Sequence, residues 1–286
     1  MRIGRRPWLL ALLTPWRAMA APIDANPDVP RRGRPLAFPR DHGAHPGART
    51  EWWYATGWLQ TDRTPGDAPA FGFQITFFRS RTGLAADLPG RLAPRQLLFA
   101  HAALTDLGAG RHLHAQRLAR WDGRTQGGAV AASLTDTAVA LGRWQLTRAA
   151  AGGAYDTRID DANAGFGLAL QLQPTQPLLL QGEAGWSRKG PDVADASHYY
   201  SLPQLQVNGR LRLAGHEQAV QGRAWLDHEW SEQVLPAQAQ GWDWIGMNVS
   251  DGSALTAFRL RRPDGTALWA GGSHRSAEGR LTIFAA

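Results

Sequence analysis

The stretch that decides the fold reads Phe71-Gly72-Phe73-Gln74-Ile75-Thr76-Phe77-Phe78, a run rich in aromatic residues. A second apolar run spans residues 97–104 and ends at the turn-forming residues 105–108. Aromatic and β-branched residues are enriched in β-strands, and helical periodicity is hard to find elsewhere in the chain. The sequence therefore predicts an all-β protein.

Four dipeptides predict tight turns between strands. Asn or Asp followed by Gly tolerates the positive φ angles that a two-residue hairpin turn requires. The four pairs are Asp122-Gly123, Asn208-Gly209, Asp251-Gly252 and Asp264-Gly265. Many short strands joined by such turns are typical of antiparallel sheets that close into barrels.

An internal repeat predicts two barrels in tandem. Residues 53–62 align with residues 242–251, and residues 74–79 align with residues 254–259. Both copies read as strand, turn and strand, in the same order and with similar spacing, which favours a duplication.

The expected domains follow from this repeat. Beyond the second copy only residues 260–286 remain, far fewer than follow the first copy, so the second barrel is expected to be incomplete. We expect a signal peptide over residues 1–20, an irregular lead-in over 21–48, a first lipocalin-like barrel over 49–185 and a second over 186–286.

The N-terminus predicts export. Residues 1–6 include three arginines, and residues 8–13 form an apolar run that is too short to span a bilayer. Ala18-Met19-Ala20 has the small-x-small pattern that signal peptidase recognises. We therefore expect a periplasmic or secreted protein, exported by the Sec pathway or, given Arg5-Arg6, by twin-arginine export.

The amino-acid composition argues against nucleic-acid binding and against cysteine-based sites. The net charge of +7 includes four arginines of the leader, and the basic residues are not clustered as in a nucleic-acid surface. Lys189 is the only lysine, which we interpret as composition bias. Cysteine is absent, which excludes disulfides and thiolate sites, and no metal or cofactor is expected. The 13 Trp against 4 Tyr fit either an apolar ligand cavity or a barrel core.

The first segment that could carry chemistry is Glu51-Trp52-Trp53-Tyr54. On a strand, Glu51 and Trp53 point to one face while Trp52 and Tyr54 point to the other. A carboxylate beside indoles either contacts a ligand in an apolar cavity or is a charge at the rim of an aromatic core.

A second segment spans residues 186–203. It joins the basic Arg188-Lys189 to His198, Tyr199 and Tyr200, which together offer donors for an anion or a carboxylate. The alternative is a linker between the barrels with a solvated charge patch.

The densest segment is Trp225-Leu226-Asp227-His228-Glu229-Trp230. Two carboxylates beside an indole are costly unless they are hydrogen-bonded or protonated, so the pair indicates either acid–base chemistry or a structural network. Alternation places Trp225, Asp227 and Glu229 on one face and Leu226, His228 and Trp230 on the other.

These segments resemble the AttH-like family of lipocalin-like proteins, which includes the carotenoid 1,2-hydratase (hydroxyneurosporene synthase) group. The likeness is greatest to the AttH-type branch, and strings such as WLDHEW and GWDW are rare enough to be specific. The matching stretches run in order through residues 51–57, 71–79, 99–104, 187–190, 199–203, 224–230 and 241–244.

The resemblance implies two calycin-type barrels, export to the periplasm and an apolar ligand. AttH-type proteins are encoded in many bacteria beside ABC-transporter permeases. The hydratase branch adds water across a terminal isoprenoid double bond without a cofactor.

Two functions follow as hypotheses. The first is an exported protein that binds a hydrophobic lipid or isoprenoid and works with an ABC-transporter permease, without nucleic-acid binding and without a membrane-spanning segment. The second is a cofactor-independent hydratase with Asp227, Glu229 and His228 as catalytic candidates. The residues expected to contact the ligand are Glu51, Trp52, Trp53, Tyr54, Tyr199, Tyr200, Trp225, Trp230, Trp242 and Trp244.

Cleavage after Ala20 gives a direct prediction. Protein recovered from the periplasm of its native host should begin at Ala21, because signal peptidase removes the leader during export. N-terminal sequencing or intact-mass measurement checks this, and a periplasmic protein that still carries Met1 would contradict it.

Overall fold

The computed structural model describes residues 26–62, 68–83 and 93–284, and in these ranges the chain is almost entirely β-sheet. This confirms the all-β prediction. No helix in the same ranges has the length and apolar character needed to cross a bilayer. The elements are η1 (Arg40–His42), β1 (Thr50–Gln60), β2 (Phe71–Arg81), β3 (Gln96–Asp106), β4 (Arg111–Trp121), β5 (Val130–Ala132), β6 (Ala138–Leu141), β7 (Trp144–Arg148), β8 (Tyr155–Asp161), β9 (Phe166–Gln173), β10 (Leu179–Leu180), β11 (Trp186–Arg188), β12 (Ala196–Leu213), β13 (His216–Ser231), β14 (Gly241–Asn248), β15 (Ala254–Arg261), β16 (Ala267–Arg275) and β17 (Leu281–Phe284).

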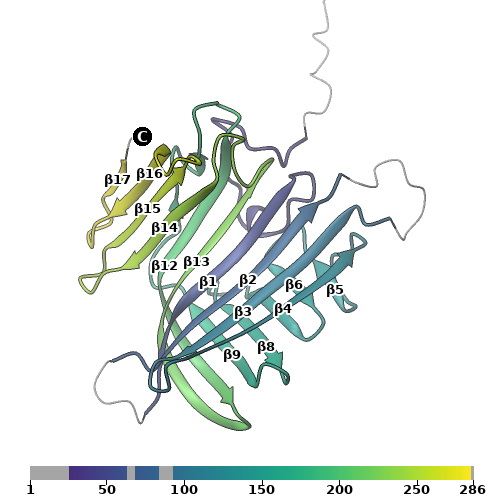
Figure 1. Ribbon diagram of the computed structural model, residues 1–286, viewed down its shortest axis with the longest axis vertical. Coiled ribbons are helices and arrows are strands. Elements are labelled where there is room, and N and C mark those ends of the chain that lie inside the picture. Colours follow the sequence, from purple (N-terminus) through teal and green to yellow (C-terminus); the bar gives the residue numbers. More distant parts are fainter. Residues whose placement is uncertain (1–25, 63–67, 84–92, 285–286) are drawn as a thin grey trace, which may run out of the picture.

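Thirteen strands form one antiparallel sheet in the order β4-β3-β2-β1-β13-β12-β9-β8-β7-β6-β5, with β10 and β11 paired to β12. The sheet is nearly closed, because the edge strand β4 comes back against β5 and β6 (Figure 1). The inward-facing side chains fill the barrel with a hydrophobic core that includes Trp53, Phe73, Phe77, Leu98, Phe166 and Leu211. This is a lipocalin-like barrel, as predicted.

A smaller sheet of four strands, β14-β15-β16-β17, lies beside the β12–β13 hairpin (Figure 1). The two copies of the sequence repeat correspond to the hairpins β1–β2 and β14–β15. The expected division between residues 185 and 186 does not coincide with the change of sheet, which lies between Ser231 and Gly241.

The long hairpin of β12 and β13 explains that difference, because both of its strands follow residue 185 and yet belong to the large sheet. The half of β12 from Gln206 to Leu213 pairs with β9 in the large barrel, and the half from Ala196 to Ser201 pairs with β10 and β11. A bulge between Leu202 and Leu205 separates the halves, and it contains Pro203, which has no N–H to donate to the ladder.

The turn predicted at Asn208-Gly209 is wrong, because this pair lies inside β12. A β-carbon on Gly209 would lie 2.1 Å from the carbonyl oxygen of Ala169, so glycine is needed there for the close approach of β9. The hairpin turn is instead Ala214-Gly215, both with positive φ. Two of the other pairs do lie in turns between paired strands, with Asp251-Gly252 between β14 and β15 and Asp264-Gly265 between β15 and β16. Asp122-Gly123 lies instead in the longer connection, residues 122–129, that leads from β4 to β5.

The signal peptide expected over residues 1–20 lies outside the described residues. The described part of the lead-in, residues 26–48, contains no strand, as expected. It nevertheless packs closely against the barrel, since Asp41, His42, Ala44 and His45 are all buried.

Candidate functional site

The sheet register places the chemically capable residues in two sets on opposite faces. Asp227 on β13 pairs with Tyr54 on β1 and Ser201 on β12, and Glu229 pairs in the same way with Trp52 and Tyr199. Because side chains alternate along a strand, these rows face away from the barrel core. The alternation predicted for the segments 51–54 and 225–230 is therefore present in the structure.

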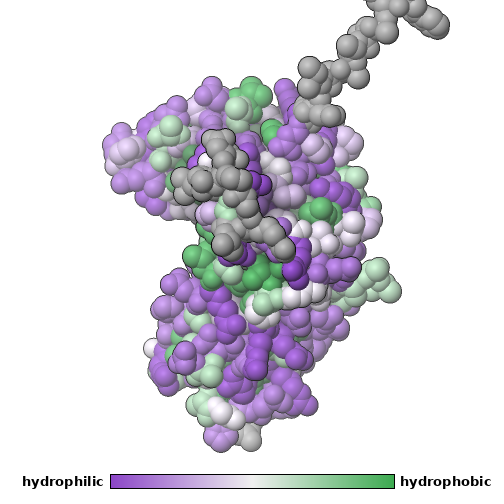
Figure 2. Space-filling view, turned by 90° about the vertical axis from the view of Figure 1, so that its right-hand side faces the viewer, coloured by the Kyte–Doolittle hydropathy of each residue, from purple (hydrophilic) through white to green (hydrophobic). Residues whose placement is uncertain are grey.

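A cavity of about 600 Å³ lies between this outer face of the large sheet and the small sheet. In the space-filling view, hydrophobic residues gather around the hollowed middle of one face of the molecule (Figure 2). The described residues that line the cavity are Thr50, Trp52, Tyr54, Gln74, Thr76, Phe78, Phe99, Ser187, Lys189, Ser197, Tyr199, Asp227, Glu229, Val234, Leu235, Trp242, Trp244, Phe258 and Leu260.

The cavity brings together only part of the predicted set. Trp225 is buried and is not among the described lining residues, although its Nε1 donates to Asp227. Glu51, Trp53, Tyr200, His228 and Trp230 point to the opposite face, into the barrel, because they occupy the alternate positions of the same strands. The predicted residues that do line the cavity are Trp52, Tyr54, Tyr199, Trp242, Trp244, Asp227 and Glu229.

Asp227 is an acid held in one orientation. Its Oδ1 accepts hydrogen bonds from Ser201 Oγ at 2.6 Å and from Trp225 Nε1 at 2.7 Å, and Oδ2 takes part in neither bond. Burial raises the pKa of Asp227 to about 7, although the donated hydrogen bonds of Ser201 and Trp225 oppose this rise. A large fraction of Asp227 is therefore a neutral acid near pH 7.

A buried chain of hydrogen bonds connects this acid to the small sheet. Ser273 on β16 donates to Gln181 Oε1 at 2.8 Å, and Gln181 Nε2 donates to Ser201 Oγ at 2.9 Å. Gln181 also lies 3.4 Å from the hydroxyl of Thr256 on β15. The position of Ser201, and through it that of Asp227, thus depends on contacts from both sheets.

Glu229 has a different environment from Asp227. Its Oε1 accepts a short hydrogen bond from Ser197 Oγ and lies 3.6 Å from Lys189 Nζ. Burial raises the pKa of Glu229, and the nearby ammonium opposes that rise. Lys189 also donates to Ser231 Oγ at 2.8 Å and lies 5.8 Å from the centre of the Trp52 ring.

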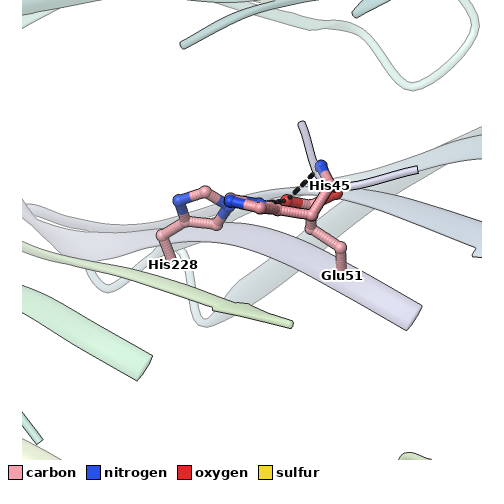
Figure 3. Close-up of side chains that lie close together, drawn as sticks. All are labelled: His45, Glu51 and His228. Carbon is pink, nitrogen blue, oxygen red and sulfur yellow. Dashed lines mark hydrogen bonds and ion pairs between the residues drawn. The ribbon is translucent and has the colours of Figure 1, made fainter. Parts of the chain in front are cut away.

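The barrel side of the same strands holds a second polar cluster, centred on Glu51 (Figure 3). The carboxylate accepts bonds from Arg79 Nε at 2.8 Å, His45 Nδ1 at 2.7 Å and His228 Nε2 at 2.9 Å. Burial alone would raise the pKa of Glu51, but His45, His228 and Arg79 together hold that pKa well below its ordinary value. Glu51 is therefore an ionised, fully buried carboxylate.

Residues of the lead-in complete this cluster. The second ring nitrogen of His45 faces Asp41 Oδ1 at 3.1 Å, and the ring stacks on Trp230 at 3.6 Å. His42 Nδ1 lies 2.7 Å from the hydroxyl of Tyr200, which in turn lies 3.0 Å from His228 Nδ1. Sequence reasoning missed Asp41, His42 and His45, and the one available signal was the sequence Asp-His-x-x-His at residues 41–45.

His45, Glu51 and His228 present ligand atoms within 4.8 Å of one another, which is the spacing of a metal site. The donor set fits a hydrogen-bond network better. Both oxygens of Glu51 already accept from donors, including the backbone N–H of His45, and the Arg79 guanidinium lies against the same carboxylate. A fixed cation beside the carboxylate disfavours a second one, so we assign this cluster a structural role.

Comparison with known proteins gives a family and a fold. The sequence model of the AttH-like family matches residues 29–286. A crystal structure of a candidate AttH from Nitrosomonas europaea is 44% identical, with a TM-score of 0.79, over 90% of this chain and 74% of that chain.

A kievitone hydratase from Nectria haematococca matches over 89% of this chain and 70% of that chain, with a TM-score of 0.61. At 12% identity this likeness shows the fold. None of the curated proteins compared matches the sequence.

The raised pKa of Asp227 has a measurable effect on stability. Between about pH 4 and pH 7 the folded state keeps a proton that the unfolded state releases, so the stability that this proton contributes is lost as pH rises to 7. Asp227→Asn removes the ionisation and keeps an acceptor for Ser201 and Trp225. We expect the variant to be about 2–4 kcal/mol more stable than the wild type at pH 8, a difference that disappears near pH 4.

Urea unfolding at both pH values measures this difference. The control is Asp243→Asn, because Asp243 is exposed and Arg259 and Arg261 lower its pKa, so no gain at pH 8 is expected there. An Asp227→Asn protein less stable than the wild type at pH 8 would show that Asp227 is charged and stabilising in the folded state.

Proposed function

Because the chain belongs to the AttH-like family, whose sequence model matches residues 29–286, we propose that it is an exported lipocalin-like protein that binds a hydrophobic lipid or isoprenoid. The observation that carries the proposal is the cavity between the two sheets. Its volume of about 600 Å³ is within the range of small-molecule sites, and 11 of its 19 described lining residues are aromatic or apolar, while the other eight are polar or charged.

The aromatic side chains are arranged to contact such a ligand. Trp244 lies edge-on to Tyr54 at 5.7 Å, and its Nε1 donates to the hydroxyl of Tyr199 at 3.2 Å. Trp242 is 51% exposed although it lines the cavity, so apolar surface extends from the cavity to solvent. Exposed apolar surface of this kind is typical of binding sites.

Export and a transporter partner belong to the same proposal. A protein that carries a hydrophobic molecule outside the cytoplasm needs a membrane component to supply or accept it, and an ABC-transporter permease would do so. The leader sequence supports export, and the mature N-terminus at Ala21 tests it.

Ligand binding is measurable through tryptophan emission. A neutral polyene should quench this emission saturably, because Trp52, Trp242 and Trp244 line the cavity. Trp244→Ala should weaken binding about tenfold or more, since a large buried aromatic contact is lost. Trp52→Phe should reduce the amplitude of quenching.

The matched control is Trp58→Phe. Trp58 lies on the same face of β1 as Trp52 but is not part of the cavity lining, so its replacement should leave the amplitude unchanged. Quenching that does not saturate, or that is equal in all variants, would contradict binding in this cavity.

A second candidate function is hydration of an isolated carbon–carbon double bond, and the neutral Asp227 in an apolar cavity favours it. Asp227 would give its proton to the alkene carbon, and the Trp52 and Trp244 faces would stabilise the resulting cation. Water would add to that cation, and Glu229, two residues along the strand and about 7 Å away, would accept the proton that water releases.

Two conservative variants separate hydration from binding alone. If hydration occurs, Asp227→Asn and Glu229→Gln should each lower turnover of an acyclic isoprenoid by about 10²–10⁴-fold while its affinity changes only a few-fold. Product analysis by mass spectrometry measures the turnover. Wild-type protein that binds the isoprenoid and forms no alcohol would rule hydration out and leave the binding proposal intact.

A further inference from the structure

Lys189 is the only lysine of a chain that has 31 basic residues, so the other 30 are arginines. Where this protein needs a positive charge it uses guanidinium groups, as in Arg79 against Glu51 and Arg259 against Asp243. A guanidinium stays protonated at all relevant pH values, whereas an amine can lose its proton and act as a nucleophile. Lys189 is therefore the one side chain of this sequence that can offer a neutral amine.

The position of Lys189 is that of a buried amine facing a ligand site. Lys189 follows β11 directly, is 6% exposed, and lines the same cavity as Asp227 and Glu229. Its Nζ is held by Ser231 at 2.8 Å, with Glu229 at 3.6 Å and the Trp52 ring at 5.8 Å. Among the described lining residues it is the only cationic side chain.

Burial lowers the pKa of Lys189, although the Glu229 carboxylate opposes this. Desolvation in an apolar pocket is one of the ways in which proteins activate a lysine for attack on a carbonyl group. The carboxylate that opposes the shift is also the counter-ion that a positively charged imine requires.

We propose that Lys189 binds an apolar aldehyde or ketone covalently, as an imine, inside the cavity. The proposal rests on the proposed function, because the carbonyl compound must first enter the cavity as a hydrophobic ligand.

Imine formation needs only Lys189, Glu229 and the carbonyl compound. The ammonium of Lys189 gives one proton to Glu229, and the free Nζ lone pair forms a bond to the carbonyl carbon. Glu229 returns the proton and the carbonyl oxygen leaves as water, while a C=N bond replaces C=O. Ammonium and aldehyde thus give iminium and water, so the charge beside Glu229 is unchanged and no oxidant or reductant is consumed.

The experiment uses all-trans-retinal as probe and all-trans-retinol, which has no carbonyl group, as its matched control. Both should quench tryptophan emission, and only retinal should give a product after borohydride reduction. Digestion and mass spectrometry should place one retinyl group on the peptide that contains Lys189. Because no other lysine exists, the α-amino group is the one competing amine, and it lies on a different peptide.

Two variants of Lys189 separate amine chemistry from charge. Lys189→Arg removes the amine but keeps a cation beside Glu229, so this variant is expected to fold like the wild type. Lys189→Met removes both the charge and the amine. Each should reduce the trapped product about tenfold or more. Glu229→Gln keeps the amine but removes both the proton shuttle and the counter-ion, so the imine should form more slowly and lose its proton at lower pH, which visible absorption measures.

Three results would overturn the proposal. Retinal that quenches emission without a product at Lys189 would refute covalent capture and leave ligand binding standing. An equal yield from Lys189→Arg would place the reaction elsewhere. If neither retinal nor retinol quenches emission, the cavity does not bind apolar ligands and the proposed function fails together with this inference.

Discussion

The ionised carboxylate of Glu51 is the constraint on which the surrounding structure depends. A charge with no access to water must be compensated by fixed donors, and these come from separate parts of the chain: Arg79 on β2, His228 on β13 and His45 in the lead-in. Removing one of these donors would leave the buried charge only partly compensated. The carboxylate thus fixes the lead-in and three strands to one another, and it holds β1 and β13 in register beneath the cavity.

Because β1 and β13 are held from the barrel side, their other face is free to form a site. The cavity-facing residues alternate along these strands with residues of the Glu51 cluster. The two sets therefore lie on opposite faces of the same sheet, and they include Trp52, Tyr54, Asp227 and Glu229 on the cavity side. The packing and hydrogen bonds on the barrel face hold the backbone of these strands in place, and this backbone orients the side chains on the cavity face. Because one face of the sheet lies in the barrel core and the other lines the cavity, the segments 51–54 and 225–230 are dense in polar and aromatic residues.

The fold was largely predictable from the sequence, and the site only in part. Strand runs and the alternation of residues 225–230 predicted the faces correctly, because a period of two is a local property. Asn208-Gly209 gave a wrong turn, since the close approach of β9 is a tertiary contact that no local pattern contains. The division at residue 185 missed that β12 and β13 complete the large sheet. Gln181 and Ser201 gain their hydrogen-bond partners from segments distant in sequence, and the ring of His45 stacks on the distant Trp230, so their roles became visible only in three dimensions.

The chain from Ser273 through Gln181 and Ser201 to Asp227 has a direction. Asp227, when ionised, can only accept, so Ser201 must donate to it; Ser201 then accepts from Gln181, and Gln181 accepts from Ser273. Each group polarises the next in the same sense, and aligned hydrogen bonds of this kind strengthen one another. The packing of β16 against Gln181 therefore influences the pKa of Asp227 through two intervening groups, the Gln181 amide and the Ser201 hydroxyl.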